Sequence, residues 1–400
     1  LPTPDLEDAL LTIRETWYDI AMSKTFTERV EGDDEEFLAN IRRLAQAGRN
    51  LWVKLFQLDS DSSMHKVGKW LEDNPLQKGA IIQVSLADNA TDFVFPWALI
   101  YDRKVPKKHY ELPDPEGFWG LRYCIEQQLS NQNKGTDKPV QIQDKLRVGF
   151  MLWAQFRNAD EQKVLMENWT QRNPDKLEIT IPPITDADDC SALLDDCDAH
   201  ILYFYTHGYT RNRQADIGVG ENLQLFTNRY EKLQEDDPRH ELWKFLYDSV
   251  KQDKFEPNRS WIELTYGRLY LDELYDNIES KFSSEPLVFL NMCESAQITP
   301  SLSQSFIHFF IERGAKGVIG TECPMTVEFA HPFSEKFLGD LLAGETVGNA
   351  LLNARSHFMK LKNPLGLAYT LFGSATTCFQ PAILKPLTMP ATTNVSTESS

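Results

Sequence analysis

The sequence predicts an α/β fold: a mostly parallel central sheet with helices on both faces. From residue 146 onward, strand-like and helix-like segments alternate, as in successive βαβ units. The segments 200–206 and 286–291 are apolar almost throughout, which is typical of strands covered by helices on both sides. A chain of 400 residues is long enough for roughly two to three domains and for a large core.

The first third of the chain opens with helices. Apolar residues recur at helical spacing from Leu6 to Trp17, and a second helix is predicted to begin after Asp33 and to end at Gly48. A strand is predicted over 80–86. The polar segment 131–139 has the composition of a linker, so we expect one domain over 1–140 and a second over 141–385.

The second part is predicted to alternate between strands and helices. The insertion 209–260 is too long for an ordinary connection; we expect it to be functional or mobile, with a helix near 242–250. Residues 386–400 are rich in Thr, Ser and Pro, which predicts a disordered tail. The predicted strands are 146–153, 177–181, 200–206, 286–291 and 317–321, and the predicted helices are 159–172, 186–196 and 301–313, the last capped by Gly314.

Composition excludes several classes of function. The net charge of −18 argues against nucleic acid or an anionic membrane surface as the main partner, because attraction to phosphate needs a basic face. No apolar run reaches the length of a membrane span. Six cysteines without zinc spacing predict neither a disulfide framework nor a metal site, so we expect a cytoplasmic protein with no cofactor. The start without Met suggests that an upstream region has been removed.

Two predicted central strands end in residues with reactive side chains. The first runs into His207-Gly208 and the second into Cys293. Carboxyl ends of parallel strands border the ligand crevice of an open sheet, so a thiol and an imidazole would meet there if the strands are neighbours. Such a pair is a nucleophile with a proton carrier, and the N–H groups of Gly208 and Cys293 could stabilise an oxyanion. A lone Cys at the end of a buried strand is more often an inert apolar residue, so both interpretations stay open.

The ordered succession of segments around these residues resembles the CHAT domain, a caspase-like cysteine peptidase family related to separases. The resemblance implies a caspase-like sheet over 141–385 as the catalytic half. It implies that the first part, which contains the Phe93–Asp102 stretch, is a degenerate companion α/β half. The segments that carry the resemblance are 205–208, 288–296, 310–321, 333–344, 350–355 and 368–373.

The resemblance also implies roles for individual residues. His207 matches the proton-transfer histidine, Cys293 the nucleophile and Gly208 the oxyanion-hole glycine. Related peptidases that cut after Arg or Lys often carry Asp two residues before the Cys or just before it, where this chain has the neutral Asn291 and Met292. Glu322 is predicted either to form an acidic wall of the substrate pocket or to be a solvated loop residue. The predicted substrate-binding residues are Asn291, Glu294, Thr321 and Glu322.

These observations predict a regulated cysteine endopeptidase that cleaves a specific protein. The resemblance implies a bacterial signalling or defence setting, including CRISPR-linked systems, with an upstream sensor or repeat domain or a separate activator. Direct binding to nucleic acid or to a membrane is not expected. One alternative is a catalytically silent CHAT-like scaffold that binds protein partners through the same groove. Another is an acyltransferase or thiol hydrolase acting on a small molecule.

Overall fold

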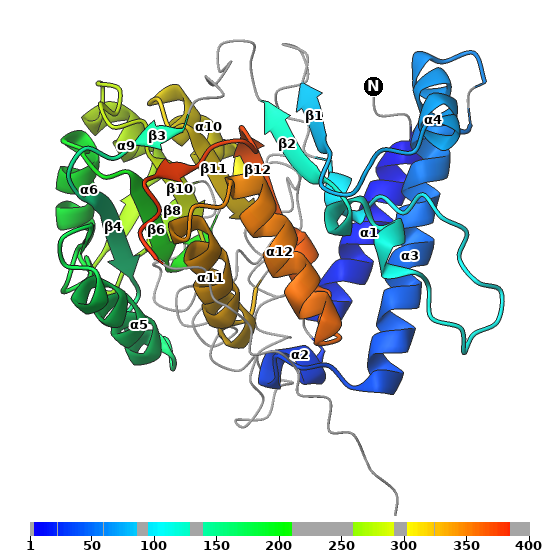
Figure 1. The fold of residues 1–400 in the computed structure, drawn as a ribbon, viewed down its shortest axis with the longest axis horizontal. Helices are drawn as coiled ribbons and strands as arrows, with labels where there is room; N and C mark the ends of the chain where they lie inside the picture. Colours follow the sequence, from blue (N-terminus) through cyan, green and yellow to red (C-terminus); the bar gives the residue numbers. More distant parts are fainter. Residues whose placement is uncertain are drawn as a thin grey trace, which may run out of the picture.

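A single eight-stranded sheet forms the centre of the molecule (Figure 1). We describe the fold from a computed structural model, in which residues 4–21, 23–58, 60–85, 95–128, 139–209, 259–291, 302–323 and 325–384 are placed. The strand order is β1-β2-β12-β11-β10-β6-β4-β5. All neighbouring pairs are parallel except β11 with β12, which is antiparallel. The predicted mostly parallel α/β sheet is therefore confirmed.

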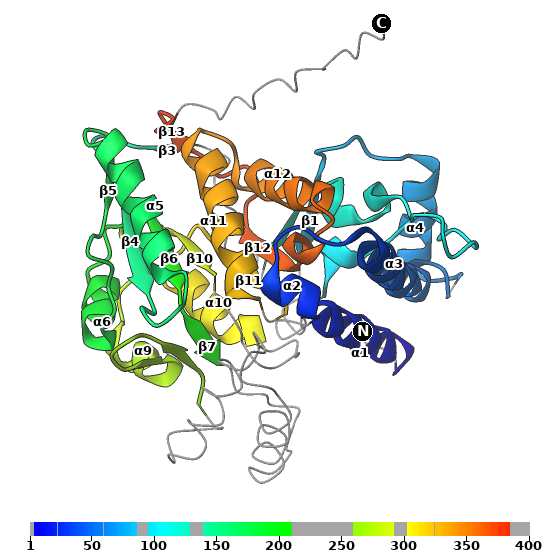
Figure 2. The same cartoon turned by 90° about the horizontal axis from the view of Figure 1, so that it is seen from below.

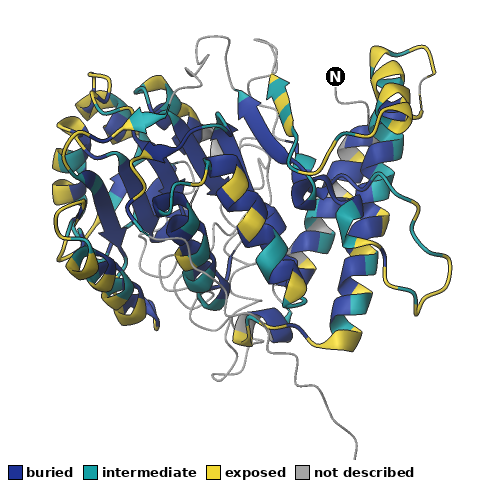
Figure 3. Ribbon diagram, viewed as in Figure 1, coloured by how far each residue is buried: buried dark blue, intermediate teal, exposed yellow. Residues whose placement is uncertain are grey.

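The strands of the sheet come from both the first third and the rest of the chain. Residues at the sheet centre are apolar on both faces, so both faces must be covered. β6 and β10 are accordingly buried along their whole length, as Figure 3 shows for the central strands. The strand bounds are β1 Ile81–Ser85, β2 Cys124–Gln128, β4 Leu146–Leu152, β5 Leu177–Ile179, β6 Ile201–Tyr205, β10 Leu287–Leu290, β11 Gly317–Thr321 and β12 Tyr369–Gly373.

Two layers of helices cover the sheet, and Figure 2 shows them on opposite sides. One face carries α5, α11 and α12, and the other carries α6, α9 and α10. Alternate residues of each strand point to the two cores: Tyr203 and Phe289 to the first, Phe204 and Val288 to the second. The helix bounds are α5 Ala159–Arg172, α6 Ala187–Asp195, α9 Leu271–Asn277, α10 Leu302–Glu312, α11 Val327–Leu342 and α12 Val347–Lys360.

The helices of the first third pack beside this layered structure. They are α1 Pro4–Ala21, α2 Lys24–Glu28, α3 Asp34–Phe56 and α4 Ser63–Asp73. Their apolar residues belong to the same core cluster as the first face of the sheet, and β1 and β2 extend that sheet. The first third therefore shares sheet and core with the remainder. The division into 1–140 and 141–385 stays a prediction, because most of the proposed linker lies outside the described residues.

The second helix begins as predicted but does not end at Gly48. The carboxylate of Asp33 accepts the N–H groups of Glu35 and Glu36, which caps α3 at its start. The helix then continues through Gly48 to Phe56. Gly48 is needed for packing: a Cβ there would overlap the carbonyl oxygen of Leu99, and the Gly48 carbonyl accepts the N–H of Tyr101 at 3.2 Å. The predicted helix end at Gly48 was therefore wrong.

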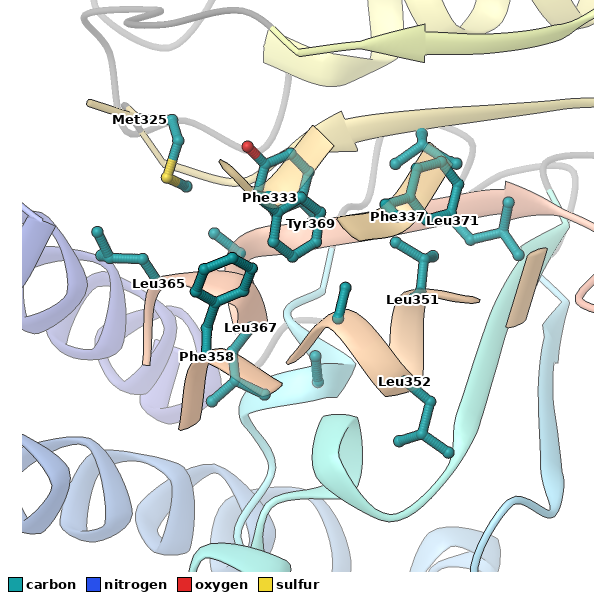
Figure 4. Packing of buried hydrophobic residues seen from close by; sticks show 14 of the residues in the cluster. Met325, Phe333, Phe337, Leu351, Leu352, Phe358, Leu365, Leu367, Tyr369 and Leu371 are labelled. Carbon is teal, nitrogen blue, oxygen red and sulfur yellow. The ribbon is translucent and has the colours of Figure 1, made fainter. Parts of the chain in front are cut away.

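Aromatic packing joins α11 and α12 to strand β12 (Figure 4). The rings of Phe333 and Tyr369 are stacked, with centroids 3.8 Å apart and planes 5° apart. Phe358 of α12 lies edge-on to Phe329, at a centroid distance of 4.8 Å. The strand that follows α12 is thus held directly beneath both helices.

Two small sheets complete the described structure. β3 Val140–Gln141 pairs with β13 Phe379–Gln380, and β7 His207–Tyr209 forms an antiparallel sheet with β8 Trp261–Glu263 and β9 Arg268–Tyr270. Most of the predicted insertion (210–258), its expected helix at 242–250 and the tail 386–400 lie outside the described residues. Within the described segments, no helix combines the length and apolar character needed to cross a membrane.

Candidate active site

The two strands predicted to deliver the reactive residues are direct neighbours in the sheet. β6 and β10 are parallel, with Leu287 opposite Ile201 and Leu290 opposite Phe204. The backbone N–H of Asn291 continues this ladder by donating to the carbonyl oxygen of Phe204 at 3.0 Å. The carboxyl ends of the two strands therefore lie side by side, which meets the condition set in the sequence analysis for the two reactive residues to approach each other.

The site histidine lies where the chain leaves the large sheet. β6 ends at Tyr205, and His207 begins β7 of the small three-stranded sheet. Its residue is 6% exposed. The imidazole lies between two aromatic rings, with its centroid 4.3 Å from that of Trp153 and 4.6 Å from that of Phe156. Because both rings contact the imidazole at steep angles of 66°, they restrict its rotation.

The loop that carries these two rings is itself fixed at both ends. The N–H of Trp153 donates to the carbonyl of Tyr205 at 3.0 Å, and the N–H of Ala154 donates to Oγ1 of Thr265 at 2.7 Å. The hydroxyl of Tyr205 donates to Oδ1 of Asn158 at 2.7 Å. These bonds tie the loop after β4 to Tyr205, in the strand that precedes His207, and to the connection between β8 and β9.

Sequence reasoning missed Trp153, Phe156 and Asn158. A signal for them was present, since they follow the carboxyl end of β4, the other neighbour of β6. Residues that follow the carboxyl ends of parallel strands border the ligand crevice, and this rule, which led to His207, applies equally to the loop after β4.

Asn291 is completely buried, and its side chain is hydrogen-bonded to other parts of the described protein. Its Nδ2 donates to the hydroxyl of Tyr203 at 3.2 Å and to the carbonyl of Ala330 at 3.0 Å. Its Oδ1 accepts the hydroxyl of Tyr369 at 2.7 Å. The side chain, predicted to bind substrate, thus offers no surface to a substrate in this structure and instead ties β6, β10, β12 and α11 together.

Thr321 and Glu322 lie at the same edge, where β11 ends next to β10. Both residues are half-buried. The N–H of Glu322 donates to the carbonyl of Ala368 at 2.9 Å, and its carboxylate accepts the hydroxyl of Thr370. Burial raises the pKa of this carboxyl, whereas the Thr370 hydrogen bond and the charges of Arg14 and Arg355 lower it. The Glu322 carboxylate is therefore engaged with neighbouring residues of the protein and is not a fully solvated loop residue.

The predicted nucleophile Cys293 and the predicted substrate residue Glu294 lie outside the described residues, in 292–301. Gly208 is described and buried, opposite Ile262 in the small sheet. The other five cysteines, 124, 190, 197, 323 and 378, are free and buried. Burial raises the pKa of the Cys190 thiol to about 12 and that of Cys323 well above its usual value. These buried thiols are thus poor nucleophiles.

Within the described segments, no group of three or more His, Cys, Asp and Glu side chains is arranged so that it could hold a metal ion.

Comparison with known proteins gives one family match. The family model of the CHAT domain matches residues 157–370, which include His207, Cys293 and the strands that precede them.

A probable protease from Vitiosangium sp. (strain GDMCC 1.1324) is 32% identical over 169 residues, which is 40% of this chain and 22% of that protein. Among solved structures, the separase–securin complex of Saccharomyces cerevisiae aligns with a TM-score of 0.39 at 12% identity, covering 92% of this chain and 22% of the solved chain. A second structure of that complex aligns with a TM-score of 0.37 at 11% identity. This chain thus spans about a fifth of the length of each of these three relatives.

Proposed function

Because the chain belongs to the CHAT domain family, we propose that it is a caspase-like cysteine endopeptidase in which Cys293 is the nucleophile and His207 the proton carrier. The main support is the pairing of β6 with β10. The N–H of Asn291 reaches the carbonyl of Phe204, His207 follows Phe204 by three residues, and Cys293 follows Asn291 by two. Chain connectivity from two adjacent strand ends therefore favours a meeting of the sulfur and the imidazole.

The proposed reaction begins when the Cys293 thiolate attacks the carbonyl carbon of the scissile peptide bond. The N–H groups of Gly208 and Cys293 donate to the oxyanion of the tetrahedral intermediate. His207, as imidazolium, donates its proton to the leaving amine, which leaves a thioester on Cys293. Water then attacks the thioester carbonyl while neutral His207 accepts its proton, and release of the acid restores the thiolate and the imidazolium.

The surroundings of His207 support a role in which the imidazole must be held in one place. Its ring is flanked by Trp153 and Phe156, and the loop that carries them is bonded to Tyr205 and Thr265. Asn291 fixes the end of β10 through Tyr203, Tyr369 and Ala330. We assign Asn291 this supporting role, because such rigid strand ends reduce the freedom of the groups that follow them.

We propose that a protein segment binds along the carboxyl edge of the sheet, with Glu294, Thr321 and Glu322 contributing to its selection. The partner would be one specific protein, and activation would come from an upstream sensor or repeat domain or from a separate activator in a bacterial signalling or defence system, CRISPR-linked systems included. We place the enzyme in a reducing cytoplasm. The five free cysteines of the described segments support that compartment, and the net charge of −18 argues against a direct nucleic-acid partner.

Cleavage of a proteome-derived peptide library, followed by mass spectrometry, tests this proposal. The intact chain and a Cys378→Ala control are expected to yield the same new amino termini. Cys293→Ala and His207→Ala are expected to yield none. Equal cleavage by Cys293→Ala and the intact chain would reject Cys293 as nucleophile. If no variant cleaves but all retain the same protein partners, the silent scaffold is the better description.

A further inference from the structure

A row of three side chains crosses the small sheet that contains His207. His207 on β7 is directly opposite Glu263 on β8, and Glu263 is directly opposite Arg268 on β9. Directly opposite residues in an antiparallel sheet project from the same face, with Cβ atoms about 5 Å apart. The imidazole, the carboxylate and the guanidinium therefore follow one another along one face of this sheet.

The carboxylate in the middle of the row is held by two donors. Its Oε2 accepts Nε of Arg268 at 2.7 Å and the indole Nε1 of Trp261 at 3.1 Å. The guanidinium of Arg268 lies over the Trp261 ring, 4.5 Å from its centroid. The side chains of Arg268 and Glu263 are only 11% and 15% exposed, so solvent screens this pair less than a surface pair.

The loop that packs on His207 is bonded to the same hairpin. Thr265 lies two residues after Glu263, between β8 and β9, and its Oγ1 accepts the N–H of Ala154 at 2.7 Å. Trp153 and Phe156 contact the imidazole from this loop. The aromatic contacts and the Glu263–Arg268 pair thus belong to one connected structure around His207.

We propose that Glu263 is a positioning residue for His207, and that Arg268 keeps the Glu263 carboxylate ionised and in place. The proposal rests on the proposed function in one respect, namely that His207 carries a proton there. In the proposed arrangement, one imidazole nitrogen would donate its hydrogen to the Glu263 carboxylate, which the register places beside it, so that the opposite nitrogen would face the sulfur and the leaving amine. Glu263 accepts a hydrogen bond and takes up no proton.

Among the described residues, one further ion pair lies on the elements that pack around His207. Arg157 and Glu328 form an ion pair where the 153–158 loop meets α11, so their charges offset each other. Cys293 is the remaining titratable group that the proposed function brings to His207. A Cys293→Ala background removes that group and leaves Glu263 and Arg268 as the nearby charges to be tested.

Titration of His207 by NMR in the intact Cys293→Ala chain tests the proposal. Labelling of the Cε1 position gives one signal for each of the eight histidines, and His207→Gln identifies the signal of His207. Glu263→Gln should lower the pKa of His207 by about one unit, because an adjacent carboxylate stabilises the imidazolium. Arg268→Gln should raise it, because the carboxylate loses its cation. Glu178→Gln, at an exposed position on edge strand β5, is the matched control and should leave the pKa unchanged.

The opposite signs separate positioning from a loss of structure. General loosening of the sheet would move the pKa of His207 in the same direction in both variants, and that result would overturn the proposal, as would an unchanged pKa in Glu263→Gln. If Arg268→Gln does not fold, Glu263→Asp replaces it: the charge is kept, so the pKa should stay closer to that of the parent chain than in Glu263→Gln.

A kinetic measurement connects the same residue to catalysis. In the active chain, Glu263→Gln should lower kcat by about tenfold or more with little change in KM, and should move the pH profile by the shift seen in NMR. A change confined to KM would overturn the positioning role. The NMR measurement needs no substrate, so failure of the proposed peptidase activity and failure of the positioning role are distinguishable.

Discussion

Tyr369 of β12 donates its hydroxyl hydrogen to Oδ1 of Asn291 at 2.7 Å, which fastens the end of β10 to a strand two positions away in the sheet. Asn291 also donates to Tyr203 and to the carbonyl of Ala330. All of these groups are buried. If one partner is removed, the remaining polar groups can bond neither to it nor to water, and this lowers stability. The strand end that precedes Cys293 is therefore held by hydrogen bonds from several directions.

Two substitutions that remove hydrogen bonds of Asn291 should lower the free energy of unfolding by different amounts. Tyr369→Phe deletes one hydrogen bond but keeps the stacking on Phe333, so the free energy of unfolding should fall by about 1 kcal/mol. Asn291→Ala deletes all the bonds and should lower it by about 3 kcal/mol. Urea unfolding measures both. Equal stabilities for the two variants would contradict this account of Asn291.

Arg355 of α12 should be required for stability. Its Nη1 donates to the carbonyl of Gly120 at 3.3 Å and its Nη2 to the carbonyl of Tyr369, which joins the first third of the chain to the sheet. Burial lowers the pKa of this guanidinium to about 10. Arg355→Met keeps the bulk but leaves two buried carbonyls without donors, so unfolding should become easier by about 3 kcal/mol. A variant as stable as the parent in urea would show that these bonds contribute nothing.

The central strands and their flanking helices were predictable from the sequence because the pattern there is local. The apolar segments 200–206 and 286–291 contain strands β6 and β10, and the periodic segment 159–172 forms helix α5. The contacts that hold the site together are not local. Asn291 meets Tyr203 and Tyr369, which are 88 and 78 residues away, so no spacing rule could pair them.

Gly48 shows a second limit of sequence reasoning. Its backbone freedom indicated a helix end, whereas its lack of a side chain serves the approach of residues 99–101 to α3. Glu263 and Arg268 were missed for another reason: their relation to His207 appears only in the cross-strand register of a sheet built from segments far apart in the chain.

Two glycine substitutions in helices should have opposite effects. Gly48→Ala should lower the melting temperature, because its Cβ would overlap the Leu99 carbonyl oxygen and crowd Cβ of Tyr101 at 3.0 Å. Gly339→Ala in α11 is the matched control, since its Cβ would meet only Trp169 at 4.0 Å and alanine favours a helix. Thermal unfolding of both variants checks the pair. If both raise the melting temperature, the close approach at Gly48 is not a constraint.

Protonation of His200 should destabilise the fold. Nδ1 of its imidazole accepts the backbone N–H of Arg147 at 3.0 Å, which requires the neutral ring. Burial, helped by the charge of Arg147, lowers the pKa of His200, while Asp198 raises it less. The unfolded chain therefore binds this proton more readily. The stability that the neutral ring contributes is present above about pH 6.5 and is lost as the pH falls through the lower folded pKa.

Urea unfolding between pH 7.5 and pH 5 measures this dependence. His200→Gln can still accept the Arg147 N–H through its amide oxygen but does not titrate, so its stability should decline less steeply with acid. Burial also lowers the pKa values of His331 and His357, so their protonation should account for the part of the stability loss that remains in the variant. An equally steep decline in the variant and the parent would contradict the role of His200.

The central claim is that His207 activates Cys293, and the rate at which each cysteine reacts with iodoacetamide at neutral pH tests it most directly. Mass spectrometry of the tryptic peptides gives the rate for each cysteine, with fragment ions separating Cys190 from Cys197, which share one peptide. We predict that Cys293 reacts faster than the five buried cysteines. We also predict that His207→Ala slows only Cys293, while the exposed control His308→Ala changes none of the six. A Cys293 that reacts no faster than the others, or at the same rate without His207, would contradict the account.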